Sequence, residues 1–266
     1  MAGIDSYRLT GKHALVCGST QGIGKACAMQ FAELGASVTL FARDEAALKR
    51  VKNELPAGDV RAHSYLVADF NDPQRVAAEA RRHIQETGPV HILLNNSGGP
   101  PHGPVTEATP QQFLDAFQRH VVCNQLLAQA VIPGMKQDRY GRIINIISTS
   151  VKEPIPGLGI SNTTRWAVAA WAKTMAGELA PFGITVNNIL PGFTATARIE
   201  ELFKAKAKSS GVSEEQVRKE ALARIPMGRL ASADEIAAGA AFLASPAASY
   251  VTGINLPVDG GRTQSM

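Results

Sequence analysis

Two hydroxyl side chains and one cation are spaced along the chain in a way that suits chemistry on an oxygen atom. Ser148 closes the apolar run RIINIIS, Ser161 follows thirteen residues later, and Arg165 comes four residues after that. An offset of four places Ser161 and Arg165 on one face of a helix. A serine hydroxyl can hold a substrate oxygen and a guanidinium can stabilise negative charge on it, but neither gives up a proton readily at neutral pH. We therefore expect a site that binds and polarises an oxygen.

Two neighbouring groups are able to exchange a proton. Lys152 lies four residues after Ser148 in the loop STSVKEP, and His102 lies in the loop GGPPHG after another apolar run. A lysine removed from water beside an arginine is an effective acid or base. The alternatives are a solvated lysine paired with Glu153 and a loop histidine without a role. A third source of the proton is an ordered water held by Asn124, Ser148 and Arg165.

A glycine-rich turn indicates a nucleotide site. VCGSTQGIGKA follows an apolar run and opens an amphipathic one, with Gly18, Gly22 and Gly24 in the turn. Glycine permits a tight turn and a close backbone approach, and the helix that follows offers free N–H groups to a pyrophosphate. Glycines also occur in turns that bind nothing. The position between a first strand and a first helix favours a dinucleotide site.

The end of the next apolar run bears on which dinucleotide binds. An acidic residue directly after SVTLF would bind the ribose 2′-hydroxyl. Here Ala42 and Arg43 come first, and an arginine can hold a 2′-phosphate through charge-assisted hydrogen bonds. Asp44 follows and offers Arg43 a local partner instead. We expect NADP rather than NAD.

Short apolar runs alternate with longer amphipathic ones, which predicts the fold. Strands are expected at residues 13–17, 37–41, 61–69, 90–96, 142–148, 184–190 and 253–259. Helices are expected at 21–35, 46–55, from about 72, at 109–135, from 157 to near 183, once or twice within 197–224, and at 232–245. This alternation predicts an α/β Rossmann fold, a doubly wound parallel sheet of about seven strands with helices on both faces.

Size and composition limit the class of protein. The chain has 266 residues, 45% hydrophobic and 19% charged, with a net charge of +4, which suits a single domain over 1–266. Its basic residues are scattered, so we expect no nucleic-acid partner. It has no secretion signal and no apolar run that would span a membrane, so we expect a cytoplasmic protein. Three widely spaced cysteines do not suit a disulfide framework or a zinc site, and no metal is expected.

Several motifs together resemble the short-chain dehydrogenase/reductase superfamily. Their order and spacing are similar from about residue 9 to 261, and the general resemblance is to the 3-oxoacyl-carrier-protein reductase type. Besides the glycine turn, the motifs are Asp69 in VADF, NNSG at 95–98, Asn124, INIIS, ILPGF at 189–193, IPMGRL at 225–230 and VTGINLPVDGG at 251–261. The resemblance implies hydride transfer between a nicotinamide and a carbonyl or secondary alcohol of a small molecule.

The resemblance also implies cofactor-binding residues. The pyrophosphate and the adjoining ribose would lie on the first turn, at Gly18, Ser19, Gln21, Gly22, Ile23 and Gly24. Asp69 and Phe70 would flank the adenine, and Asn96 and Gly98 would line the adenosine ribose. The nicotinamide end would be held by Pro191, Gly192 and Thr194. Asn124 would support a water relay, and Ser148 would bind the substrate.

One helix turn departs from the superfamily pattern. A Tyr-x-x-x-Lys turn follows the serine in the superfamily, and here its two positions hold Ser161 and Arg165. Arg165 can still hold the nicotinamide ribose, as the lysine does, so the cofactor half is kept while the usual acid is lost. We expect an active NADP-dependent oxidoreductase with a non-standard proton donor. The alternative is a catalytically inactive nucleotide-binding protein that serves as a sensor or a structural subunit.

Two further expectations follow from the resemblance. Residues 193–228 are expected to form a mobile lid that selects the substrate, with an apolar cover from Phe193, Ile199, Leu202, Phe203 and Val212. A homotetramer or homodimer is expected, in which the helix at 109–135 and the helix that contains Arg165 form one interface.

Overall fold

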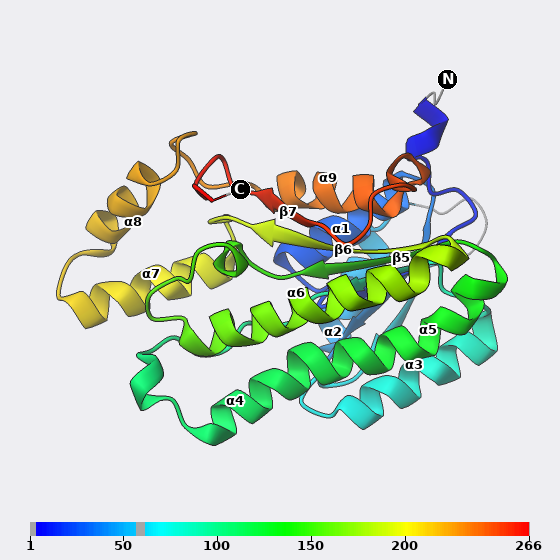
Figure 1. Ribbon diagram of the computed structural model, residues 1–266, viewed down its shortest axis with the longest axis horizontal. Helices are drawn as coiled ribbons and strands as arrows, with labels where there is room; N and C mark the ends of the chain where they lie inside the picture. The colour runs from blue at the N-terminus through cyan, green and yellow to red at the C-terminus, as the bar shows by residue number, and fades with distance from the viewer. Residues whose placement is uncertain (1–3, 57–61, 266) are drawn as a thin grey trace.

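A seven-stranded parallel sheet forms the middle layer of the molecule (Figure 1). The computed structural model describes residues 4–56 and 62–265. Its strands are β1 (His13–Cys17), β2 (Ser37–Ala42), β3 (Ser64–Val67), β4 (Ile92–Asn95), β5 (Gly141–Ile146), β6 (Ile184–Pro191) and β7 (Asn255–Val258). They lie in the order β3-β2-β1-β4-β5-β6-β7. The winding therefore reverses between β1 and β4, which is where doubly wound sheets bind ligands.

Helices cover both faces of the sheet, as predicted. One face carries α1 (Gly22–Glu33), α2 (Glu45–Glu54) and α9 (Ala233–Ala244), and the other carries α3 (Pro73–Thr87), α5 (Cys123–Gln137) and α6 (Gly159–Leu179). α4 (Pro110–Phe117) precedes α5 and contacts α6. Figure 1 shows α7 (Ala197–Ser210) and α8 (Glu214–Ala223) beyond the end of the sheet to which the strands point. No helix in the described ranges is long and apolar enough to cross a membrane.

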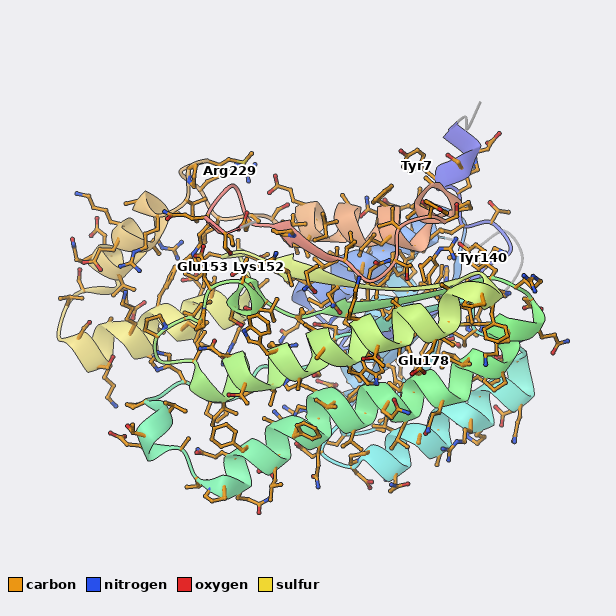
Figure 2. All side chains as sticks on the ribbon, viewed as in Figure 1. Tyr7, Tyr140, Lys152, Glu153, Glu178 and Arg229 are labelled. Carbon is orange, nitrogen blue, oxygen red and sulfur yellow. The ribbon has the colours of Figure 1, made fainter. Side chains whose placement is uncertain are left out.

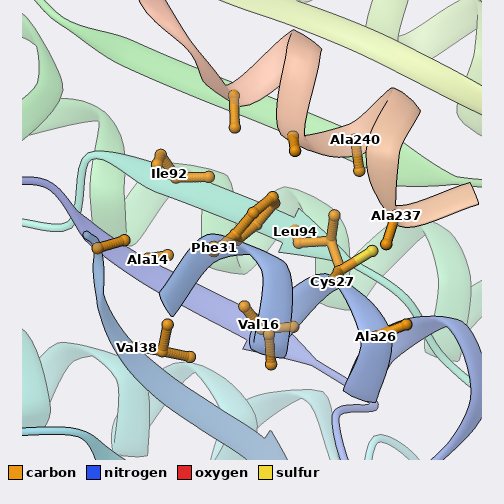
Figure 3. Packing of buried hydrophobic residues seen from close by; sticks show 14 of the residues in the cluster. Ala14, Val16, Ala26, Cys27, Phe31, Val38, Ile92, Leu94, Ala237 and Ala240 are labelled. Carbon is orange, nitrogen blue, oxygen red and sulfur yellow. The ribbon is translucent and has the colours of Figure 1, made fainter. Parts of the chain in front are cut away.

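Small side chains bring α1 and α9 close together over the sheet (Figure 3). Cys27 and Phe31 of α1 are fully buried against Ala237 and Ala240 of α9, with Leu94 of β4 beneath them. Each large apolar side chain buried in this way contributes roughly 1.5–3 kcal/mol. This packing fixes the first helix, and with it the glycine turn at its start.

Four asparagines form a ladder of side-chain amides across half of the sheet. The Nδ2 atom of Asn95 donates to Oδ1 of Asn145, Asn145 donates to Asn188, and Asn188 donates to Asn255, each at 2.8 Å. The four residues are register partners on β4, β5, β6 and β7. Buried amides are stable only when they are paired, so this asparagine ladder holds the four strands in one register.

The helix expected at 109–135 has an unexpected turn in its middle. α4 begins with a capping box between Thr109 and Gln112, a π-helical turn covers Gln118–Val122, and α5 continues to Gln137. A π turn contains one more residue than an α turn, which changes the side chains that face inward. His120, in the middle of the π turn, is only 2% exposed.

Some predicted boundaries differ from the structure. The strand expected at 61–69 covers only Ser64–Val67, and residue 61 lies outside the described ranges. β5 ends at Ile146, so Ser148 is not in the strand but caps the short 3-10 helix Thr149–Val151. Residues 197–224 form two helices, α7 and α8, whose buried side chains pack mainly on each other. Ile199 and Phe203 belong to that small core, whereas Val212 is 41% exposed.

Candidate active site

Most of the predicted site residues follow the carboxyl ends of five neighbouring strands. The glycine turn follows β1, Arg43 follows β2, Asn96 follows β4, Ser148 follows β5 and Gly192 follows β6. Because the sheet is parallel, these ends meet along one edge. The structure therefore brings together, at the reversal between β1 and β4, segments that are far apart in the sequence.

The glycine turn is packed too tightly for side chains. A Cβ atom on Gly24 would lie 2.1 Å from the carbonyl oxygen of Gly18, and one on Gly18 would lie 2.7 Å from Nδ2 of Asn96. Gly18 and Gly22 also have φ angles of +60° and +54°, which glycine adopts without strain. Asn96 donates to the carbonyl oxygens of Cys17 and Gly18. Asn96 thus braces the turn from β4.

The first turn of α1 suits an anion. Gln21 precedes the helix in an extended conformation, and its side chain makes no capping hydrogen bond, so the first N–H groups of α1 are open to a ligand. Ile23 lies within this turn and is partly buried. Ser19 is fully buried and accepts a hydrogen bond from Phe41 N at 3.0 Å. Its side chain therefore ties the turn to β2.

The residues expected to hold the adenosine end lie at the ends of β2 and β3. Arg43 is exposed, and its Nη1 lies 3.8 Å from Oδ2 of Asp69. Asp44 does not pair with it, because Asp44 accepts from Ala47 N as the cap of α2. Phe70 is buried edge-on against Phe41, with ring centroids 5.3 Å apart. Among the residues that the structure describes, the Arg43 guanidinium is therefore held by one long ion pair at the surface.

The residues expected at the nicotinamide end are shaped by close backbone packing. Pro191 ends β6, and Gly192 follows it, where a Cβ atom would lie 2.7 Å from Cα of Asp259. Thr194 is buried and forms a bridge with Ala231. Gly98 lies in the loop after β4 with open space around it. The segments after β4 and β6 thus flank Ser148, which follows the strand between them, β5.

Arg165 lies under the end of β5. It is 9% exposed, and its Nη1 donates to the carbonyl oxygen of Ile146 at 2.9 Å, while its buried Nε has no partner among the described residues. Burial, with a smaller effect from the charge of Arg198, lowers the pKa of Arg165 to about 10. A guanidinium with that pKa stays charged at neutral pH. Arg165 thus places a positive charge at the carbonyl group of Ile146, which comes two residues before Ser148 in the chain.

The two serines remain able to donate. Ser148 Oγ accepts from Ser150 N at 3.0 Å, which leaves its hydroxyl hydrogen available. Ser161 lies one helical turn before Arg165 and is partly buried. Its hydroxyl makes no hydrogen bond within residues 4–56 and 62–265. Both hydroxyls are therefore free to bind a substrate oxygen.

The loops that carry Lys152 and His102 pair with each other. Gly103 N donates to Gly157 O at 2.9 Å, and His102 lies against Gly157. Figure 2 shows Lys152 and Glu153 on the loop above the start of α6. Glu153 accepts from Gln264 N at 2.6 Å, and no ion pair joins it to Lys152 in the part of the chain that is described. The alternative in which Lys152 pairs with Glu153 is therefore not observed.

Comparison with known proteins agrees with this geometry. Residues 18–263 match the family described as Enoyl-(Acyl carrier protein) reductase. The NADPH-dependent reductase BacG of Bacillus subtilis is 32% identical over 95% of this chain and 98% of its own length. The 3-oxoacyl-[acyl-carrier-protein] reductase FabG of Vibrio cholerae is 36% identical over 95% and 98%. The crystal structure of YwfH, an NADPH-dependent reductase involved in bacilysin biosynthesis, has a TM-score of 0.90 and 31% identity over 96% and 99%.

The chain is a short-chain dehydrogenase/reductase. The resemblance inferred from the motifs is thereby confirmed at the level of the superfamily and of the FabG-like group. The roles of the individual residues in this short-chain dehydrogenase/reductase stay predictions.

One buried residue of this short-chain dehydrogenase/reductase, His120, was not predicted from the sequence. Asn124, the predicted support of a water relay, is buried in α5. His120 lies four residues before Asn124, in the π turn that precedes α5, and the charge of Arg165 contributes to lowering its pKa. Ser97, in the loop after β4, contacts His120 Nδ1. The sequence offered little to distinguish this histidine, because it lies in a helical pattern four residues before Asn124.

Proposed function

We propose that the protein is an NADP-dependent oxidoreductase that moves a hydride between a nicotinamide and the carbonyl or secondary alcohol carbon of a small molecule. The observation that carries this proposal is the placement of the glycine turn, Ser148 and Arg165 along one edge of the sheet. The relatives named NADPH-dependent reductases support it. When bound, the reduced cofactor supplies the hydride.

The residues present fit such a cofactor. The turn leaves room for a pyrophosphate because Gly18 and Gly24 lack side chains, and the open N–H groups of α1 match its charge. Arg43 would bind the 2′-phosphate by leaving its long ion pair with Asp69. We further propose that α7 and α8 act as the lid. Arg198 of α7 supports this, because it donates to Pro100 O at 2.6 Å and so connects the lid to the loop after β4.

Ser148 and Arg165 would act on the substrate oxygen. In reduction, negative charge develops on that oxygen as the carbonyl carbon gains the hydride. Ser148 would donate a hydrogen bond to it, and Ser161 would hold it from the next helix. The charge of Arg165 lies in a buried setting, where charge stabilisation is worth more than in water. These groups lower the barrier but do not supply the proton.

We propose that a group other than a phenol supplies the proton. Lys152 is the first residue to test, because it lies on the loop next to Ser148 and has no ion-pair partner in the described ranges. The test mixes purified protein with NADPH and a panel of ketones and aldehydes, and follows NADPH oxidation. Binding without turnover on any of them would favour the inactive alternative. Full activity in both Lys152→Met and Ser148→Ala would exclude a role of these two residues in proton transfer and in binding the substrate oxygen.

We also propose a homodimer or homotetramer formed through α4 and α6. Leu114 and Phe117 on α4 and Trp166 on α6 are 56%, 45% and 49% exposed, and α4 contacts α6. Large apolar side chains that gather at a surface favour a subunit contact. Light scattering of the wild type and of Trp166→Ser tests this, and an unchanged mass would contradict it.

A further inference from the structure

His120 is a buried titratable group that the mechanism above does not use. Its ring lies on the π turn and is 2% exposed. The Nδ1 atom lies 2.8 Å from Ser97 Oγ, and the buried Nε2 atom has no partner among the described residues. A buried polar nitrogen without a partner is costly and calls for an explanation. The π turn is also the kind of local distortion found at functional sites.

The charges around His120 keep its imidazole neutral. Burial has the largest effect, and the positive charges of Arg165 on α6 and Arg119 on the same π turn add to it; together they lower the pKa of His120 well below its usual value. The other polar contact comes from Ser97, which is not charged. A neutral imidazole carries one N–H donor and one acceptor nitrogen. Since Ser97 can donate to Nδ1, the ring can carry its proton on Nε2.

Arg165 has a matching atom without a partner. Its Nε is buried and unpaired within the described residues, as is Nε2 of His120. Both can be N–H donors, and the π turn that carries His120 packs against α6. Arg165 Nη1 donates to Ile146 O at the end of β5, and Ser97, the partner of His120, follows the neighbouring strand β4. A water that accepts from both would have its own two hydrogens left to donate. Such a water would be a proton donor aimed away from the two nitrogens.

We propose that His120 and Arg165 hold one water between them, and that His120 passes a proton from Ser97 through this water to the substrate oxygen. This inference rests on the proposed oxidoreductase function and differs from donation by Lys152. His120 acts through the water and is therefore a positioning and relay residue. Asn124, one helical turn further along, is not needed for this path.

The proton path balances. The substrate oxygen, holding the electron pair of the former C=O bond, takes a proton from the water, and the water takes the proton of His120 Nε2. The lone pair left on Nε2 makes the ring an acceptor there, while Nδ1 takes the proton of Ser97, whose oxygen is reprotonated by solvent. Ser97 is partly exposed, so solvent can reach it. The ring is restored after product release. Nε2 then takes a proton from water, and Nδ1 returns its proton to Ser97 as Ser97 gives its own hydroxyl proton back to solvent.

The first experiment needs no turnover. Nitrogen NMR of protein labelled at histidine gives the tautomer and charge of each ring, with His120 assigned from His120→Asn. We expect a neutral His120 with its proton on Nε2 near pH 6, and a shift of its Nδ1 signal in Ser97→Ala. A charged ring, or a proton on Nδ1, would overturn the proposal.

The second experiment measures NADPH-dependent reduction. We expect His120→Asn and His120→Leu to lose about 100-fold in kcat, with little change in the KM for NADPH, because a positioned acid–base group contributes 10²–10⁴-fold. The solvent deuterium isotope effect should change in the same variants. His83→Asn removes another buried histidine that bonds Thr39 far from the site, and it serves as the matched control.

The outcomes separate the two proposals. Loss of kcat in both His120 variants but not in His83→Asn supports the relay, and unchanged kcat in His120→Asn overturns it. If the wild type reduces no substrate, the proposed function fails, while the NMR result still decides whether His120 has the required proton. If His120→Leu does not fold, His120→Asn and the NMR experiment give the decision.

Discussion

Replacing His120 by asparagine should make the protein less sensitive to acid. The pKa of His120 is well below its ordinary value in the fold, first because of burial and then because of Arg165 and Arg119. In the unfolded chain the same histidine titrates near 6.5. The unfolded state therefore binds a proton first as the pH falls. The folded protein is therefore most stable, as far as His120 is concerned, above about pH 6.5. This part of the unfolding free energy is lost as the pH falls from there toward the lower pKa that His120 has in the folded protein.

The size of the effect follows from the unfolded state alone while His120 stays neutral in the fold. Between about pH 7.5 and about pH 5.0, protonation of one histidine with a pKa near 6.5 stabilises the unfolded chain by about 2 kcal/mol. His120→Asn has no proton to bind at this position. Its loss of unfolding free energy over this range should therefore be smaller than that of the wild type by about 2 kcal/mol.

Urea unfolding at the two pH values measures the difference. Asn124→Ala is the matched control, because it alters a buried polar side chain on the same helix without removing a titratable group. It should lower stability at both pH values equally. If the wild type and His120→Asn lost the same free energy within about 0.5 kcal/mol, an uncertainty typical of the extrapolation, the view of His120 as a buried neutral group would be refuted.

Three further predictions concern the cofactor site and the core. Gly24→Ala should weaken NADPH binding by roughly tenfold or more in a fluorescence titration, since its Cβ would collide with Gly18 O. Gly177→Ala should not, because Gly177 is an exposed residue of α6 whose Cβ would meet nothing within 4 Å. Arg43→Ala should weaken NADPH binding by about 10- to 100-fold, the loss of one or two charged hydrogen bonds, and leave NADH binding unchanged; equal losses for both would contradict the assignment. Burial raises the pKa of Cys27 to about 12, so the native thiol should not react with Ellman's reagent at neutral pH until urea unfolds the protein.

Much of this site could be predicted from the sequence because it depends on local patterns. Gly24 is needed where the first helix begins next to Gly18, and the spacing of GSTQGIG already indicated that turn. The order of strands and helices likewise followed from alternating apolar runs. Arg165 was correctly expected on the face of Ser161, because an interval of four residues is fixed by the helix itself.

What could not be predicted depends on tertiary contacts. Nothing in the residues near His120 distinguishes a π turn from a regular helix, so the sequence did not single out His120, and Asn124 was named because of the resemblance. Asp44 was considered as a local partner of Arg43 in place of a 2′-phosphate, but the structure pairs Arg43 with Asp69, which follows β3. Ile199 and Phe203 were expected to cover the substrate, yet they pack within α7 and α8. In each case the deciding contact joins segments distant along the chain.

The asparagine ladder, Asn95, Asn145, Asn188 and Asn255, has a consequence for motion. Its hydrogen bonds all run in one direction, because each asparagine donates to the asparagine on the next strand of the sheet. Bonds in such a chain polarise one another. Shifting one of these strands would break its amide bonds to the neighbouring strands. Slow opening of the enzyme, on the microsecond to millisecond scale typical of lids, should therefore occur in α7, α8 and the loop after β4. The strands β4 and β5, which precede Asn96 and Ser148, should stay still through each turnover.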